Sequence, residues 1–441
     1  MRFVILPVYL FLCLIFGGAS AGGYLGNLFL QLVAIALIFW ALVTKPGRPL
    51  RFPERMLGGL VALVCLLIFL QFLPLPLGLW ERLPQRGTLG EFDRMAGVIP
   101  GPVFLSLIPH ESLKSALWLL PALAVLVTML RLQAYQASQL AWVILTVMAV
   151  SVLLGALQIA GGHASPWYFY RITNFGSTVG FFANSNHLAT LLLAALPFLA
   201  ALVAEIRPVD PTKRVAVLGL CGAFVGIAIA GIYANGSLFG YGLVLPVVGA
   251  SALILAPFAS LRRVAAGLLV PLVAIGVIVV LNSHDGQRML AESSTLSPYV
   301  RTAIFANSWT AIGDFMPFGS GLGTFPDIYP LYENAEQTSL TYINHAHNDY
   351  LEVLVETGAL GGLALAAFFA WWLWRALRIW HAKSVDPFAC AAVIASAAIL
   401  IHSLVDYPLR TAAISTLFAV CCALMARWQD REEVPKIDVW S

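Results

Sequence analysis

A polar stretch between residues 297 and 358 carries the side chains of this sequence that are best suited to chemistry. It contains Arg301, two histidines two residues apart (His345 and His347), and three carboxylates that enter an apolar run. A neutral imidazole can accept a proton from a hydroxyl near neutral pH, and a neighbouring carboxylate can orient the ring. An arginine donates two parallel hydrogen bonds to phosphate and stays charged. The combination predicts a site for a phosphorylated substrate in which a histidine acts as a general base.

The sequence around Arg301 favours a short helix that presents the arginine. Ser297 followed by Pro298 is a good helix start, because serine caps the first N–H groups and proline fits the first helical position. The helix is expected to end at Gly313. A glycine-rich turn follows over residues 317–325 (PFGSGLGTF). Its backbone N–H groups either cradle a phosphate or only form a tight turn, and the tight turn is the simpler interpretation.

A second helix, expected to begin near Asn344, separates the roles of the two histidines. In such a helix His345 and His347 point about 200° apart, so only one of them can face a substrate. We expect His347 to be the general base and His345 to pair with a carboxylate. Asn348 adjoins the base, and Glu356 lies inside the apolar run, where a carboxylate either has a function or pairs with an arginine. The HxH spacing lacks a convincing third ligand, so no metal site is predicted.

Two further arginines, Arg171 and Arg410, lie near the ends of apolar runs and are candidates for binding the substrate phosphates. For each of them, contact with lipid headgroups at the membrane surface is an equally good interpretation.

Composition determines the class of protein that holds these residues. The chain has 441 residues, of which 60% are hydrophobic and 11% charged, and its mean hydropathy is +0.86. These values exclude a set of soluble domains and make nucleic acid an unexpected ligand. The six cysteines lie in apolar runs without metal-binding spacing, and they are interpreted as small hydrophobic residues. Twelve runs have about the length of a membrane span: 3–20, 24–44, 56–73, 113–130, 140–160, 187–205, 214–233, 238–257, 264–282, 350–374, 387–404 and 411–426.

The distribution of basic residues predicts the topology. When the loops alternate between the two sides, 17 of the 25 Lys and Arg residues fall on one side, which the positive-inside rule makes cytoplasmic. Residues 1–282 then form nine spans with outer loops at 74–112, as short amphipathic pieces, and at 161–186. Residues 283–349 form a large periplasmic loop that carries the site, and residues 350–441 form three more spans and a cytoplasmic tail. The first run followed by GGASAGG also fits a signal peptide, but a tight hairpin of the first two runs explains the charges that follow better.

The polar stretch resembles the signature region of the bacterial O-antigen ligase and polysaccharide polymerase family. The resemblance rests on R-x7-W, on PFGSGLGTF, and on HAHNDYLE-x-L-x-E-x-G. Two other segments agree with it, GFFANSNHLA at 180–189, which contains Asn186, and HSLVDYPLR at 402–410. The similarity extends over nearly the whole chain.

This resemblance implies an all-α polytopic membrane protein with about twelve transmembrane helices and a periplasmic helical cap, similar to GT-C glycosyltransferases. Such proteins move a glycan en bloc from an undecaprenyl-diphosphate carrier to an acceptor hydroxyl, without a metal or a nucleotide sugar at the site. No cofactor is expected, and attack opposite the leaving group would invert the anomeric centre. By the same resemblance His347 is the base, Arg301 binds the diphosphate, and Asn186 lies at the substrate site. The enzyme would lie in the bacterial inner membrane with its site facing the periplasm.

One departure from the family pattern concerns a second diphosphate ligand. The family usually has Ser-Arg-Gly-Gly at the outer end of a middle span, whereas this chain has Ser-Leu-Phe-Gly at 237–240. Either Arg171 or Arg410 replaces the missing arginine, or the activity is changed.

The sequence leaves two alternatives open, one for the acceptor and one for the class of protein. The acceptor is another lipid-linked repeat in a polymerase and a lipid A core sugar in a ligase; the segments at 74–112 and 402–410 slightly favour a polymerase. Chain-length regulators or export proteins would be further partners. A transporter or flippase of lipid-linked glycans is the second hypothesis, but it should carry charges near the middle of the membrane, between two similar halves.

Overall fold

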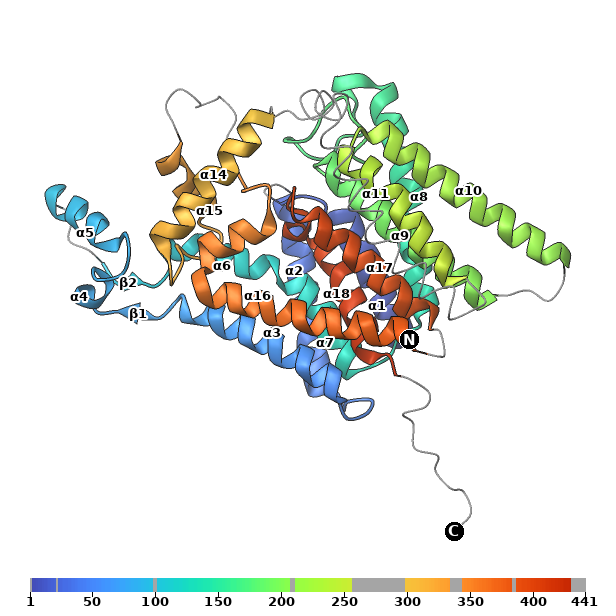
Figure 1. Ribbon diagram of the computed structural model, residues 1–441, viewed down its shortest axis with the longest axis horizontal. Coiled ribbons are helices and arrows are strands. Elements are labelled where there is room, and N and C mark those ends of the chain that lie inside the picture. Colours follow the sequence, from blue (N-terminus) through green and yellow to red (C-terminus); the bar gives the residue numbers. More distant parts are fainter. Residues whose placement is uncertain are drawn as a thin grey trace, which may run out of the picture.

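The computed structural model describes residues 2–20, 23–97, 101–206, 211–255, 298–333, 343–382 and 386–429. Regular structure in these ranges is helical, except for one antiparallel pair of two-residue strands, β1 (Pro74–Leu75) and β2 (Val103–Phe104). The chain is therefore a helical membrane protein, as the composition predicted (Figure 1).

Six helices are long and apolar enough to cross a membrane, and a bent pair of helices raises the number to seven. The six are α2 (Tyr24–Val43), α3 (Phe52–Leu70), α8 (Ala137–Ala160), α9 (Ser185–Ile206), α10 (Pro211–Asn235) and α16 (Asp349–His381); the pair is α6 (Pro109–Trp118) and α7 (Leu120–Arg131), bent by 41°. Four shorter apolar helices are α1 (Arg2–Phe16), α11 (Leu238–Ile254), α17 (Pro387–His402) and α18 (Ala412–Arg427). The total of twelve spans stays a prediction, because the expected span at 264–282 lies outside the described residues.

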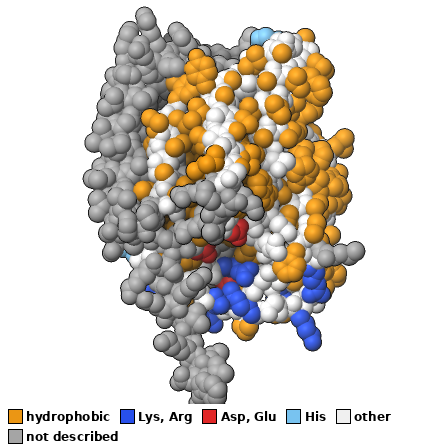
Figure 2. All heavy atoms as spheres, turned by 90° about the vertical axis from the view of Figure 1, so that its right-hand side faces the viewer, with side chains coloured by type: hydrophobic (Ala, Val, Ile, Leu, Met, Phe, Trp, Pro, Cys, Tyr) orange, Lys and Arg blue, Asp and Glu red, His pale blue; other side chains and the backbone are white. Residues whose placement is uncertain are grey.

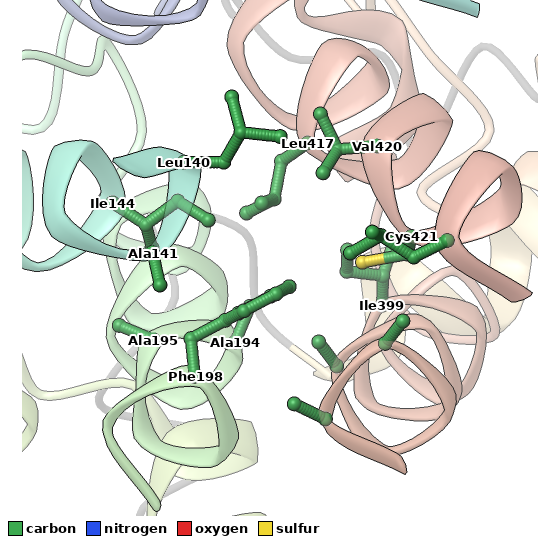
Figure 3. Close-up of a cluster of buried hydrophobic side chains, with 14 of the residues drawn as sticks. Leu140, Ala141, Ile144, Ala194, Ala195, Phe198, Ile399, Leu417, Val420 and Cys421 are labelled. Carbon is green, nitrogen blue, oxygen red and sulfur yellow. The ribbon is translucent and has the colours of Figure 1, made fainter. Parts of the chain in front are cut away.

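The core of the bundle lies where α8, α9, α17 and α18 meet. Figure 3 shows Ile144 of α8, Phe198 of α9 and Ile399 of α17 converging with side chains of α18. Alanines recur on α17 and α18, and small residues let helices approach closely within a membrane. By contrast, α2, α3 and α10 expose large apolar side chains, which is the surface that lipid would cover. Figure 2 shows hydrophobic side chains over the upper part of one face and lysines and arginines gathered at its lower end.

The basic end of the bundle is held by an ion pair to a buried carboxylate and by the hydrogen bonds of a buried arginine. Glu54 is fully buried at the start of α3 and accepts hydrogen bonds from both terminal nitrogens of Arg48, at 2.8 and 2.9 Å. At the other end of α16 from its carboxylates, the buried Arg375 donates to the backbone oxygens of Met425 and Trp428. Arg375 lies 23 residues after Glu352, or roughly 35 Å along a helix, which is about the thickness of the hydrocarbon core.

The expected outer loop at 74–112 contains α4 (Leu77–Trp80) and α5 (Arg86–Met95), and residues 109–112 already belong to α6. The β1–β2 pairing within it was not predicted. Arg86 is fully buried and donates to the backbone oxygens of Leu105 and Gly319, the latter at 2.9 Å. Burial lowers the pKa of Arg86 to about 10, so the side chain stays charged at neutral pH. Arg86 therefore ties this loop to the glycine-rich turn.

The remaining elements are η1 (Gly162–Ala164), α14 (Pro298–Phe315), α15 (Phe325–Ile328), η2 (Tyr329–Tyr332) and η3 (Pro408–Arg410). Of these, α14, α15 and η3 contact α16. α14 begins at Pro298 as predicted, but it passes Gly313 and ends at Phe315, so the expected stop was wrong.

The glycine-rich turn packs against a break in α16. Gly358 has φ 60° and ψ −148°, which interrupts the helix. The N–H groups of Ser320 and Gly321 donate to the backbone oxygens of Val355 and Glu356, each at 2.9 Å. A Cβ atom at Gly319 would lie 2.4 Å from the backbone oxygen of Glu356, which explains the glycine. Because these N–H groups bind α16, the turn serves as a packing element and the simpler interpretation of it holds.

Candidate active site

The candidate site lies where the segment before α16 meets the connection between α17 and α18. Asn348 caps α16, because its side-chain oxygen accepts from the N–H groups of Tyr350 and Leu351 and its amide donates to the backbone oxygen of Leu404. The helix therefore begins at Asp349, and the expected start near Asn344 is wrong. Both asparagines can cap a helix, and the second one does so here.

Because of this later start, His345 and His347 precede the helix and contact the same aromatic ring. Their rings lie 4.2 and 5.0 Å from the ring of Tyr407, measured between centroids. The prediction that the two histidines face opposite directions is therefore wrong. Tyr407 is buried, and burial raises the pKa of its hydroxyl above its ordinary range. Tyr407 keeps its proton, and its ring packs against both imidazoles.

His347 is paired with a carboxylate that is completely buried. Its Nδ1 lies 3.5 Å from Oδ1 of Asp406, and Asp406 has no exposed surface. Burial alone would raise the pKa of Asp406, but the interaction with His347 and the nearby imidazoles of His187 and His402 lower it below its ordinary range. His347 has a backbone φ of 50°, a left-handed conformation that is uncommon for residues other than glycine and is often found at functional sites. The pairing leaves Nε2 for a reacting group.

Two more histidines lie behind Asp406, and neither was among the predicted site residues. His402 at the end of α17 has its Nε2 3.9 Å from Oδ2 of Asp406 and its Nδ1 2.6 Å from the hydroxyl of Thr190. His187 on α9 is 1% exposed, and its ring packs edge-on against Tyr407 at 5.1 Å. The signal for this part of the site was the segment HSLVDYPLR, in which His402 and Asp406 stand four residues apart.

Arg410 binds the three carboxylates of the first turns of α16. Its guanidinium lies 3.6 Å from Asp349, 3.4 Å from Glu352 and 3.0 Å from Glu356, and the last contact is a hydrogen bond. Burial would lower the pKa of Arg410, but the three carboxylates raise it above its ordinary range. The expected pairing of Glu356 with an arginine is the arrangement that the structure contains. The charge of Arg410 is fully balanced by these neighbours.

His345 is joined to the same group through Glu352. Its Nδ1 lies 2.8 Å from one carboxylate oxygen, and the other oxygen accepts from the N–H of Ala346 at 2.9 Å. The predicted pairing of His345 with a carboxylate is thus confirmed, although the helical reasoning behind it was wrong. The site consists of two linked clusters, His347 with Asp406 and Arg410 with the carboxylates of α16.

The other predicted residues are placed differently. Asn186 accepts a hydrogen bond from Ser237 at 2.8 Å, and its backbone oxygen accepts from Thr190, which connects it to His402. Arg171 is exposed and makes no ion pair or side-chain hydrogen bond with the described residues. Arg301 belongs to α14, but its side chain lies outside the described residues. Within the described ranges, no three His, Cys, Asp or Glu side chains are arranged to hold a metal ion.

Comparison with known proteins supports the resemblance. Residues 223–366 match the family described as O-antigen ligase, so the resemblance is confirmed for the region that carries Arg301, His347 and Glu356. A search of curated proteins finds no match.

Proposed function

We propose that this chain, whose residues 223–366 match the O-antigen ligase family, is a membrane glycosyltransferase. It would move a glycan en bloc from an undecaprenyl-diphosphate carrier to an acceptor hydroxyl in surface polysaccharide assembly. The observation that carries the proposal is the contact of His347 with the buried Asp406 at 3.5 Å. A carboxylate on one ring nitrogen orients the imidazole and favours proton uptake at the other.

In the proposed step the acceptor oxygen forms a bond to the anomeric carbon of the glycan. The bond from that carbon to the diphosphate oxygen breaks, and its electron pair stays on the diphosphate. The proton of the acceptor hydroxyl moves to Nε2 of His347, while Asp406 balances the imidazolium that results. Attack from the side opposite the leaving group inverts the anomeric centre. The proposed step is metal-independent, and its leaving group needs cations that bind developing negative charge.

The charges of the described residues indicate which arginines can supply those cations. Arg410 already faces three carboxylates, so its contribution is to hold α16 and not to bind phosphate. Arg301 lies on α14, which packs against α16, and we assign it the diphosphate on the strength of the family resemblance. Arg171 is exposed in the loop before α9, and it is the better candidate for replacing the arginine that the family has at the position of Leu238.

The proposed setting is the bacterial inner membrane with the site facing the periplasm. The basic end of the bundle, at Glu54 and Arg375, would then be cytoplasmic, in agreement with the positive-inside rule. The titratable side chains of the site gather at helix ends and connections, which favours transferase over transporter. The acceptor is a glycan or the lipid A core: the segments at 74–112 and 402–410 favour polymerase, and the family description names ligase. Chain-length regulators or export proteins would be partners of either.

The test compares His347→Ala with His345→Ala in a strain that lacks the gene. Loss of general-base help should reduce transfer about 100- to 10,000-fold in His347→Ala, whereas His345→Ala should keep measurable activity. His381→Ala is a matched control, because His381 is exposed at the far end of α16. Each variant is compared at equal abundance in the membrane.

The product pattern separates the two acceptors. Loss of a polymerase leaves single repeats on the lipid carrier, whereas loss of a ligase leaves long glycan on the carrier and none on lipid A core. Normal glycan from His347→Ala would refute base catalysis by this residue.

A further inference from the structure

The carboxylate of Asp406 has an imidazole on each side. His347 approaches Oδ1 at 3.5 Å, and His402 approaches Oδ2 with its Nε2 at 3.9 Å. His402 is 1% exposed and Asp406 is not exposed at all, so neither reaches solvent. A buried carboxylate is expensive unless cations or hydrogen-bond donors accompany it. The two rings come from segments about 55 residues apart in sequence, and only one of them has a role in the proposed reaction.

The hydrogen bonds of Thr190 determine where His402 carries a proton. The Thr190 hydroxyl has one proton, which it donates to the backbone oxygen of Asn186 at 3.0 Å. When that proton is used for Asn186, Nδ1 of His402, 2.6 Å from the same hydroxyl, donates their hydrogen bond. In a neutral ring with its proton on Nδ1, the lone pair of Nε2 would face the carboxylate of Asp406, which is repulsive. A second proton on Nε2 turns this repulsion into an ion pair.

The face of the His402 ring is also suited to a cation. Phe239, in the first turn of α11, stacks on it with 4.1 Å between the centroids and 11° between the planes. An aromatic face attracts a cation that lies over it within about 6 Å. The contacts at the edge and at the face of the His402 ring therefore both favour the cation, with a proton on each ring nitrogen.

We propose that His402 is a positioning residue that carries protons on both ring nitrogens and acts as the counter-cation of Asp406. The proposal rests on the proposed function, since it concerns the carboxylate that orients the base. With its charge balanced by His402, Asp406 orients His347 without holding a proton on it too strongly.

Other titratable groups surround His402 and Asp406, and the variants used in the test leave these groups unchanged. α11 contributes Phe239, which is uncharged, and α17 contributes His402 itself. The remaining neighbours are His187 from α9, His345 from the segment before α16, Tyr407 next to Asp406 in sequence, and Glu352, which is bonded to His345.

The experiment measures the pH profile of glycan transfer in membrane vesicles between pH 5 and 9, with lipid-linked glycan extracted from the deletion strain as donor. His402→Asn keeps a donor toward Thr190 and removes the cation. Asp406 then stabilises the protonated base, so the acid limb of the profile should move to higher pH by about one unit. On that limb the rate falls about tenfold, while the rate on the alkaline plateau stays close to that of the wild type. Thr190→Val removes the acceptor for Nδ1 and should move the limb in the same direction.

The controls separate this proposal from the proposed function. His381→Asn should leave the profile unchanged. If His402→Asn or Thr190→Val lowers the rate equally at every pH, or leaves the acid limb in place, the counter-cation role is refuted while base catalysis stands. If His347→Ala retains transfer, base catalysis itself is refuted. Should His402→Asn fail to accumulate in the membrane, the acid limb of Thr190→Val decides the question alone.

Discussion

Replacing Arg410 by methionine should destabilise the protein as a whole rather than weaken substrate binding. The substitution keeps an unbranched apolar stem and removes the cation that binds Asp349, Glu352 and Glu356. The side chain of Arg410 is 17% exposed, and those of Glu352 and Glu356 are 1% and 0% exposed. Removing one partner of a buried ion pair typically costs about 3–5 kcal/mol, because the other charge stays buried without compensation. We expect a loss of that size in the free energy of unfolding.

A double-mutant cycle tests the cause of this loss. Glu356→Gln removes the carboxylate that lies closest to Arg410, at 3.0 Å. In the double variant Arg410→Met/Glu356→Gln, fewer charges are left uncompensated, so its loss of stability should be smaller than the sum of the two single losses by about 0.5–3 kcal/mol. The assay measures the free energy of unfolding of the purified protein in detergent by titration with denaturant. Arg171→Met is the matched control, and it should change stability by no more than about 0.5 kcal/mol because Arg171 is exposed.

Two results would contradict this reasoning. Additive losses in the cycle would show that Arg410 and Glu356 do not depend on each other. An Arg410→Met variant with wild-type stability and a raised KM for the lipid-linked donor would show that Arg410 binds substrate.

Three further predictions concern the neighbouring elements. Arg301→Lys keeps the charge but loses the forked donor, so transfer should fall roughly 10- to 100-fold at unchanged membrane abundance, and near-normal product would mean that Arg301 contacts only lipid headgroups. Gly358→Ala places a Cβ atom 2.3 Å from a carbonyl oxygen of the glycine-rich turn at a φ of 60°, so less folded protein should accumulate. Gly219→Ala on α10 has open space and should accumulate as the wild type does. Equal accumulation of the two variants would contradict the packing of the turn against α16. A topology reporter fused after Lys383 should report the cytoplasm and one inserted at Glu333 the periplasm, and reversed signals at both would invert the proposed orientation.

The helical membrane class was predictable because the length and hydropathy of a span are local properties of the sequence. The start of α14 at Pro298 was predictable for the same reason, since capping depends on neighbouring residues. The start of α16 was not, because Asn344 and Asn348 are both good caps and the choice depends on the tertiary contact of Asn348 with Leu404. That error of a few residues put His345 and His347 inside the helix, whereas both precede it and contact Tyr407.

The composition of the site was only partly accessible from sequence. Asp349, Glu352 and Glu356 recur at helical spacing, so their common face could be anticipated. Their partner Arg410 and the partner of His347, Asp406, come from a connection more than 50 residues later, and only the packing of α16, α17 and α18 brings the segments together. Nothing local in the sequence distinguishes Arg410 from an arginine at the lipid surface.

The break at Gly358 divides α16 into two helical segments that contact different elements. The turns before the break hold the site carboxylates and are hydrogen-bonded to the glycine-rich turn, while the part after it runs along α3 toward the basic end of the bundle. A helix without a break would transmit each change in tilt, such as one imposed by a thicker or thinner bilayer, directly to Arg410 and its partners. We expect the interruption at Gly358 to let the part after it change tilt without moving the carboxylates before it, so that the geometry of the site depends little on membrane thickness.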